Sequence, residues 1–467
     1  DAPARSRWSV LAASATTPRP VARVEDLRAA LGLEAQHRGD ANAGPRDAAA
    51  RAAGPPDVRA IVALPYDLGA VIEPRASAWD RSPDRSGSGG WDRSPERSSS
   101  QHTVDVLVAA VGADVPALAN DRSADRAAER DRSGDRSDPA RWWSRAGGDA
   151  LPHDEPACAV WRAGEVRPAA GGSRQAYERA VARALEYIRA GDVYQVNLAH
   201  PLEGAFTGSA RALASRLLRA ARPWYGAYLE QAGDERRALI SASPESFLTY
   251  DARTRRVETR PMKGTRAGAG DPRELERNDK ERAELNMIVD LMRNDLGRVC
   301  ELGSVRVDAP RDVEAHGAAS SEKSDGGASV AARTPGVLQA TATVSGTLRA
   351  GLDLADLLWA TFPPGSVTGA PKVRAMQIID ELEPAPRGPY CGAIGWVGAD
   401  GSGAFSVAIR TAEVRGLAHA PALDSIQGTL RAWVGAGIVA DSLPPAEWEE
   451  TIVKAWALRA AGLRIEA

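Results

Sequence analysis

The chain has 467 residues, of which 43% are hydrophobic and 26% are charged, and its net charge is −3. This length suits about three domains or one large domain, and the composition is that of an ordinary folded protein. The small net charge argues against a scaffold for nucleic acid or an anionic membrane, and no segment reaches the roughly 20 apolar residues of a spanning helix. We therefore expect a cytoplasmic protein without nucleic-acid or membrane partners, whose isolated Cys158, Cys300 and Cys391 are reduced, buried thiols.

The first 140 residues predict an N-terminal α+β region with low-complexity insertions. Residues 24–33 are helix-like and residues 57–73 are strand-like. Residues 79–138 repeat Asp-Arg-Ser units, which bury little apolar surface, so we expect disordered insertions there, with a strand only inside 104–119. A partner-binding tail is the alternative reading of these repeats.

Residues 141–467 predict a catalytic domain with an inserted loop at about 316–336. Apolar residues recur at helical spacing in 175–190, 279–296 and 445–462, and Gly191 follows the first helix as a C-terminal cap. Strand-like runs occupy 193–198, 236–250, 254–262, 341–348, 390–398, 403–414 and 430–440. Because strands mostly follow strands, the order favours an antiparallel α+β architecture over a parallel doubly wound sheet.

Two pairs of glutamates have helical spacing. Glu281 and Glu284 lie three residues apart in one expected helix, and Glu447 and Glu450 do so in another, so each pair projects from one helix face. If all four carboxylates converge, a cation must lie between them, and hard oxygen ligands suit Mg²⁺. Two solvated helix faces remain the alternative.

A Gly-rich segment precedes the helix-like run that begins near Pro371. Its residues Gly365, Ser366, Thr368 and Gly369 come just before this proline, which is tolerated in the first turn of a helix. Exposed amides at a helix N-terminus bind anions, and glycine lets a ligand approach the backbone. The segment does not fit the P-loop pattern GxxxxGK[ST], so it is either a carboxylate or phosphate site or an ordinary loop-to-helix junction.

Lysine is rare, with five among 59 basic residues, so each lysine raises the question of which role arginine could not fill there. Lys263 follows one strand-like run and Glu245 lies in the run before it; if these strands form a hairpin, the amine and the carboxyl flank one cavity. A desolvated lysine can act as a nucleophile, which arginine cannot because it keeps its proton, and a carboxylic acid can protonate a leaving hydroxyl. Arg410 and Lys454 offer counter-charges to a dianionic substrate, with ordinary surface ion pairs as the alternative.

Together, these motifs resemble those of the chorismate-utilising enzymes. The resemblance is dense from Gln175 to about Gly462 and is closest to component I of aminodeoxychorismate (para-aminobenzoate) synthase, kin of the anthranilate synthase large subunit. It implies a large antiparallel two-sheet sandwich flanked by helices, with the active site between the sheets. It is carried by GDVYQVNLAHP, SPESF, ETRPMKGT, DKERAELNMIVDLMRNDLGRV, FPPGSVTGAPKVRAMQIIDELEP, GPYCGAIGW, IRT, GAGIVADS and EWEET, in this order.

The resemblance also implies a set of site residues and a cofactor. Mg²⁺ is expected on the ring carboxylate of chorismate, with Glu284 and Glu450 as direct ligands and Glu281 and Glu447 supporting them. The positions that hold the substrate carboxylates, with their associated loop, are Tyr390, Arg410, Gly435, Lys454, Thr368 and Gly369.

Two positions separate the members of this family. At the position of Gln195, the relatives that use water have a lysine base, whereas the branch that uses an amine has glutamine, as this chain does. Anthranilate synthases carry alanine where this chain has Lys263, and lysine there resembles aminodeoxychorismate synthase. We therefore expect neutral Lys263 to add at C2 of chorismate while Glu245 protonates the departing C4 hydroxyl; ammonia then attacks C4 and expels the lysine.

One departure and two absences refine this expectation. Gln339 stands where anthranilate synthases and some aminating relatives have a histidine, which places histidine-dependent pyruvate elimination in doubt. No cysteine lies in a G-x-C-x-G motif, so a separate glutamine amidotransferase or free ammonia should supply nitrogen. No pyruvate-lyase domain is visible after Gly462, so conversion of the product to para-aminobenzoate is expected to need another enzyme. Anthranilate synthase component I is one alternative, and a non-catalytic chorismate-binding subunit is another. Since Asp1 is not an initiating Met, the chain is expected to be processed or incomplete.

Overall fold

The computed structural model describes residues 8–12, 16–21, 23–31, 33, 58–72, 104–110, 161–231, 235–267, 279–316, 337–419 and 425–466. The Asp-Arg-Ser repeats at 79–103 and 111–138, the segment 317–336 and Cys158 lie outside these residues, so the expectations for them stay predictions. The division of the chain at residue 140 is likewise untested.

The first sheet carries the longest strands. All its strand pairs are antiparallel apart from the parallel pair β1–β8. Its order is β1 (Trp8–Ala12), β8 (Tyr225–Gln231), β9 (Glu235–Ser243), β18 (Thr411–Ala418), β19 (Ser425–Ile438), β7 (Gln195–Ser209) and β15 (Gly369–Ala370), with β5 (Trp161–Ala163) and β6 (Arg167–Pro168) also on β7.

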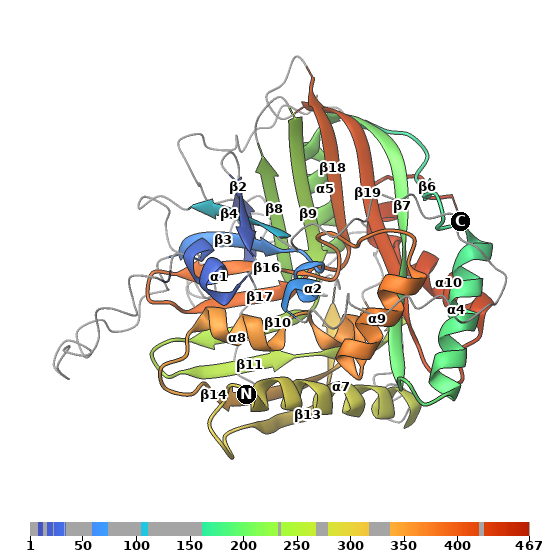
Figure 1. Cartoon of the computed structure of the whole chain (residues 1–467). Coiled ribbons are helices and arrows are strands. Elements are labelled where there is room, and N and C mark those ends of the chain that lie inside the picture. The colour runs from blue at the N-terminus through green and yellow to red at the C-terminus, as the bar shows by residue number, and fades with distance from the viewer. Residues whose placement is uncertain are drawn as a thin grey trace, which may run out of the picture.

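The second sheet is antiparallel throughout and combines strands from both ends of the chain. In Figure 1 its central strands run across the molecule below the upright strands of the first sheet. Its order is β12 (Met262–Ala267), β14 (Val337–Thr347), β11 (Arg256–Arg260), β10 (Ser246–Asp251), β17 (Gly403–Val407), β16 (Ala393–Gly398), β3 (Val58–Leu64), β4 (Val104–Ala110) and β2 (Thr16–Val21), with β13 (Arg306–His316) on β14.

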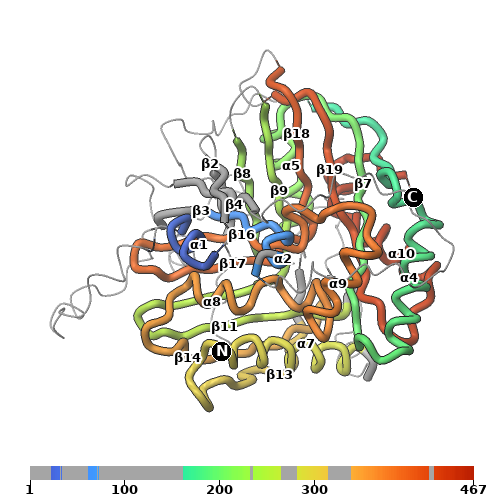
Figure 2. Tube along the Cα trace, in the orientation of Figure 1, coloured from blue at the N-terminus to red at the C-terminus, as the bar shows by residue number. Residues whose placement is uncertain are grey.

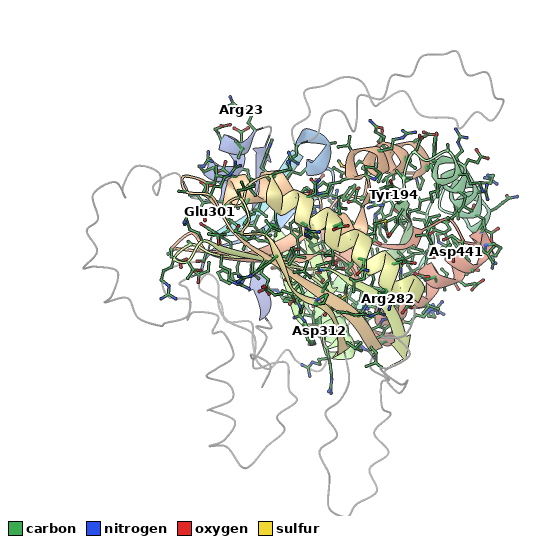
Figure 3. The ribbon with its side chains drawn as sticks, turned by 90° about the horizontal axis from the view of Figure 1, so that it is seen from below. Arg23, Tyr194, Arg282, Glu301, Asp312 and Asp441 are labelled. Carbon is green, nitrogen blue, oxygen red and sulfur yellow. The ribbon has the colours of Figure 1, made fainter. Side chains whose placement is uncertain are left out.

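Helices flank both sheets. Figure 2 shows α4 and α10 beside β7, and α7 next to β13 and β14 of the second sheet at the bottom of the view. Figure 3, seen from below, shows α7 crossing the lower face with Arg282 near one end. None of the described helices is long and apolar enough to span a bilayer. Their bounds are α1 (Val24–Ala30), α2 (Leu68–Ile72), α4 (Arg174–Arg189), α5 (Ala210–Ala221), α7 (Asp279–Gly297), α8 (Leu354–Thr361), α9 (Lys372–Leu382), α10 (Pro444–Lys454) and α11 (Trp456–Ala460).

Two buried clusters hold these layers together. The larger cluster includes Val196 of β7, Phe247 of β10 and Ile288 of α7, so it joins the two sheets and their helices. The smaller one packs Leu213 and Leu217 of α5 on the opposite face of the first sheet. Because burial of apolar surface is the main favourable term in folding, these clusters fix how the sheets face each other.

The predicted antiparallel two-sheet architecture is confirmed, with several local corrections. Residues 68–72, read as part of a strand, form α2, and the run at 445–462 is two helices separated at Ala455. Helices α5 and α8 and strand β13 were not predicted. Ser209 caps α5 by accepting a hydrogen bond from the Ala212 amide. Gly191, with φ of +82°, lies just past the end of α4, as expected.

Candidate active site

Glu245 lies where the chain passes from the first sheet to the second, between β9 and β10. Its side chain is 3% exposed, and Oε1 accepts a hydrogen bond of 2.6 Å from Ser366 Oγ. Burial raises the pKa of Glu245 to about 7, although the Ser366 hydroxyl and the positive charges of Lys263 and Arg410 act in the opposite direction. A carboxyl with this pKa can act as a general acid near neutral pH.

Lys263 reaches the same region from the second sheet. The expected hairpin is present, because β10 pairs antiparallel with β11. Lys263 itself lies just beyond this hairpin, where the chain passes Pro261 and continues as β12 on the far side of β14, opposite Ala340. Lys263 and Glu245 are nevertheless close enough to act on each other's pKa.

The two sheets meet at the Lys263 amine. A Cβ atom built at Gly437 of β19 would lie 3.2 Å from Lys263 Nζ and 2.7 Å from Gln195 Nε2 of β7. Gln195 is fully buried, and neither its Nε2 nor its Oε1 atom has a hydrogen-bond partner among the described residues. An unpaired buried amide is costly, so this position is suited to a polar ligand.

The surroundings of Lys263 make its amine easier to deprotonate than an exposed lysine. Burial is the largest influence and lowers the pKa of Lys263, and the positive charge of Lys454 acts in the same direction. The carboxylates of Glu284, Glu245 and Glu450 act against this lowering. Lys263 therefore lies among acidic side chains from α7, α10 and the crossing between the sheets.

The acidic helix positions do not assemble as one cluster. Within the described part of the chain, no group of three or more His, Cys, Asp or Glu side chains is placed to hold a metal ion. Glu284 and Glu450 both act on Lys263, while Glu281 is partly buried and Glu447 is 9% exposed. Convergence of all four carboxylates on one cation is therefore not seen, and metal binding by Glu284 and Glu450 stays a proposal.

Lys454 forms a helix-surface ion pair. Its Nζ lies 2.7 Å from Glu450 Oε1 and donates to the Gly435 carbonyl at 3.0 Å. Both side chains are about half exposed, at 44% and 50%. The structure thus shows the surface i,i+4 ion pair that was the alternative to substrate binding by Lys454. The charge of Lys454 nevertheless also lowers the pKa of Lys263.

Arg410 and Tyr390 come from neighbouring turns. Arg410 has φ of +52°, a strained value for a residue with a Cβ atom, and its guanidinium lies 5.4 Å above the Trp456 ring. Burial lowers the pKa of Arg410 to about 10, whereas Glu245 acts to raise it. The buried Tyr390 ring stacks on Trp433 with centroids 6.0 Å apart.

The Gly-rich loop is tied to β7. Thr368 Oγ1 donates to the Pro364 carbonyl at 2.8 Å, and the Thr368 carbonyl accepts from the Asn197 amide at 2.9 Å. A Cβ atom at Gly369, where φ is +142°, would lie 2.3 Å from the Gln195 carbonyl. Glycine is thus required at 369 for backbone packing, while anion binding by this loop stays a prediction. Helix α9 begins at Lys372, one residue later than expected.

A cavity of about 680 Å³ is lined by one of the predicted site residues, Tyr390, and by neither Lys263 nor Glu245. Tyr390 and Trp433 form part of its wall, together with Thr411, which follows Arg410. Arg387, Glu413 and Arg431 also line it, so charges of both signs face this space.

Several residues were missed as parts of the site. Ser366 appeared only as a loop residue, and neither Gly437 nor Arg387 was singled out. Their signals lay inside the motifs GSVTGAPK, GAGIVADS and RGPY, but the sequence does not say what each residue contacts. Gln339, in β14 beside Ala340, is 6% exposed.

The chain is similar in sequence to known proteins over part of its length. Anthranilate synthase component 1 from Streptomyces coelicolor is 43% identical over 295 residues, covering 62% of this chain and 51% of the relative. Aminodeoxychorismate synthase component 1 from Escherichia coli is 39% identical over 289 residues, covering 60% of this chain and 56% of the relative. The matched region is thus little more than half the length of these relatives.

Solved structures show the same fold. Anthranilate synthase component I from Streptococcus pneumoniae matches with a TM-score of 0.58 at 24% identity, covering 92% of this chain and 84% of that one. The model for the chorismate binding enzyme family matches residues 22–319 and 328–460. The chain therefore belongs to the chorismate binding enzyme family.

Proposed function

We propose that the chain is the chorismate-aminating component of an aminodeoxychorismate synthase. The reaction converts chorismate and ammonia into 4-amino-4-deoxychorismate and water. The observation that supports this proposal best is the partly buried Lys263 amine, which lies by Gln195 and has a lowered pKa. A neutral amine at this place can attack a ring carbon, and an arginine cannot.

The chemistry assigns one role to each of two residues. The Lys263 nitrogen bonds to C2 of chorismate, the ring double bonds shift, and the C4–oxygen bond breaks while Glu245 transfers its proton to the leaving hydroxyl. Ammonia then bonds to C4, the double bonds shift back, and the C2–nitrogen bond breaks to release Lys263. A Glu245 pKa of about 7 leaves a substantial protonated fraction at neutral pH, as the first step requires.

Ammonia is proposed to come from a glutamine amidotransferase partner, as the name component 1 of the relatives suggests. Gln195 faces Lys263 and has no partner for its buried amide among the described residues. An amide neither takes nor gives a proton at neutral pH, so it cannot activate water as a lysine base would. This favours a neutral nitrogen nucleophile over water.

Mg²⁺ is proposed to be held by Glu284 and Glu450. These carboxylates come from two helices and both act on Lys263, and Mg²⁺ binds through one or two carboxylates with waters and substrate oxygens completing its shell. When bound, the ion would orient the ring carboxylate and stabilise negative charge in the ring. Glu281 and Glu447 would support the two ligands, and Arg410, Tyr390 and the Gly435 backbone would hold the substrate.

Anthranilate synthase component I is the second candidate. Relatives with this name reach 43% and 42% identity, so sequence identity alone does not separate anthranilate synthase activity from aminodeoxychorismate synthase activity. Lys263 is the discriminating residue, because the aminodeoxychorismate route proposed here uses its amine as a leaving group.

Product identification tests the proposal. The purified chain is incubated with chorismate, Mg²⁺ and ammonium chloride, and the products are identified by mass spectrometry with authentic standards. We expect 4-amino-4-deoxychorismate, without anthranilate. Direct formation of anthranilate would select the second candidate, whereas chorismate binding without turnover would indicate a non-catalytic subunit.

A further inference from the structure

Arg387 and Glu383 form a buried ion pair that contacts the Gly-rich loop and β7. Arg387 is 2% exposed and Glu383 is 8% exposed. Two guanidinium nitrogens donate to the two carboxylate oxygens of Glu383, Nε at 2.9 Å and Nη2 at 2.6 Å. One face of the guanidinium group lies over the Tyr66 ring, with Arg387 Cζ 4.4 Å from the ring centroid.

The same guanidinium group also binds two backbone carbonyls near the site. Nη1 donates to the Val367 carbonyl at 2.9 Å, and Nη2 donates to the Asn197 carbonyl at 2.7 Å. Val367 follows Ser366, whose hydroxyl binds Glu245. Asn197 lies two residues after Gln195 on β7, and Glu383 Oε1 accepts from the Ala199 amide of that strand. Arg387 thus joins the Gly-rich loop to β7.

A buried ion pair is a weak source of stability, because desolvation of the two charges opposes their attraction. Arginine is nevertheless suited to this place, since its planar fork can hold several oxygen acceptors at fixed angles, which the single ammonium of lysine cannot do. The four hydrogen bonds of Arg387 therefore define where the loop stands relative to β7 and, through Ser366, relative to Glu245.

We propose that Arg387, with Glu383, is a positioning residue that holds Ser366 against the Glu245 carboxyl and keeps β7 in place beside Lys263. This inference rests on the proposed function in giving Glu245 the role of general acid. Arg387 itself acts through Val367 and Asn197, so its loss should change kcat more than the KM for chorismate.

The double substitution Arg387→Met with Glu383→Gln tests the proposal without leaving a buried charge alone. The matched control is Arg211→Met with Glu230→Gln, which removes a partly buried ion pair on α5 and β8. We expect the test variant to lose between about 10-fold and 100-fold in kcat, as misplaced catalytic groups do, with a KM for chorismate within about threefold of the wild type. The control variant should keep the wild-type kcat.

The pH profile of kcat supplies a readout that general destabilisation would not move. Glu245 is faced by Lys263 of β12, Arg410, the Met262 backbone and the Ser366 hydroxyl. Loss of the Ser366 hydrogen bond raises the Glu245 pKa, so the alkaline limb of the profile should move to higher pH. Ser366→Ala should cause the same movement, and adding the double substitution to Ser366→Ala should move the limb no further.

The outcomes separate this inference from the proposed function. A wild-type kcat in the double variant, an equal loss in the control, or an additive movement of the limb in the Ser366→Ala background would overturn the positioning role. If the double variant does not fold, Arg387→Lys serves instead, because it keeps the charge beside Glu383 and should move the limb in the same direction. Failure of the proposed function would show in the product of the wild-type chain, which is measured in the same assay.

Discussion

Substitution of Gly437 by alanine tests whether Gln195 and Lys263 share one reaction space. The added methyl carbon would lie 2.7 Å from Gln195 Nε2 and 3.2 Å from Lys263 Nζ. Ordinary van der Waals contact begins at 3.4 Å, so the Gln195 amide nitrogen must withdraw by about 0.7 Å, the difference between 3.4 and 2.7 Å. A misplacement of about 1 Å can reduce turnover on the order of 100-fold, which is the loss that we expect in kcat.

Stability should change little in the same variant. Both obstructing atoms are ends of flexible side chains, and the backbone at 437 is outside the left-handed region that favours glycine. Replacing glycine by alanine also restricts the unfolded chain, which contributes roughly 0.4–1 kcal/mol of stability. We therefore expect the free energy of unfolding to change by less than about 1 kcal/mol.

The assay compares ammonium-dependent chorismate turnover with the urea unfolding midpoint. Gly164→Ala is the neutral control, because its methyl would meet only atoms at 3.6 Å or more. Gly435→Ala is the opposite control, since its methyl would lie 2.7 Å from the Leu198 carbonyl and should lower stability. Wild-type turnover by a folded Gly437→Ala variant would refute the placement of Gln195 and Lys263 at the reacting ring.

Three further predictions concern the proposed chemistry. Lys263→Ala and Lys263→Arg should both abolish amination, measured as 4-amino-4-deoxychorismate formed, while chorismate still binds by calorimetry; turnover by either variant would exclude covalent catalysis. Ser366→Ala should raise the pKa of Glu245 from about 7 by roughly one unit or more, since a hydrogen bond to a charged group is worth about 1.5–3 kcal/mol. Because Glu245 must be protonated to act, the alkaline limb of the kcat profile should then move to higher pH. A limb that stays in place would contradict the role of Glu245 as the general acid. Glu284→Gln and Glu450→Gln should each raise the Mg²⁺ concentration needed for half-maximal turnover by at least about tenfold, as loss of a charged ligand predicts; an unchanged Mg²⁺ titration would remove both from the ligand set.

Local patterns predicted many of the elements, although not α2, α5 or α8, and they suggested a type of chemistry that stays a proposal. The apolar periodicity at 175–190 predicted α4, and Ser173 and Gly191 mark its two ends in the structure. The succession of strands predicted antiparallel sheets, because connections between neighbouring antiparallel strands need few residues. The presence of Lys263 in a chain with five lysines among 59 basic residues led to the hypothesis of an amine that loses its proton.

Tertiary structure alone decided which of these residues meet. The sequence does not reveal that β9 and β10 belong to different sheets, and this crossing is what buries Glu245 and raises its pKa. The sequence also does not reveal that the strand carrying Lys263 pairs with β14, or that the Lys263 amine lies near Gly437 and Gln195 of the other sheet. Such contacts join segments far apart in the chain, and they depend on how two buried faces pack together, whereas helix and strand patterns depend only on neighbours within a few residues. The pKa values that define the proposed chemistry arise from that packing, since burial and the charges facing a group set them and the group's own sequence neighbours do not.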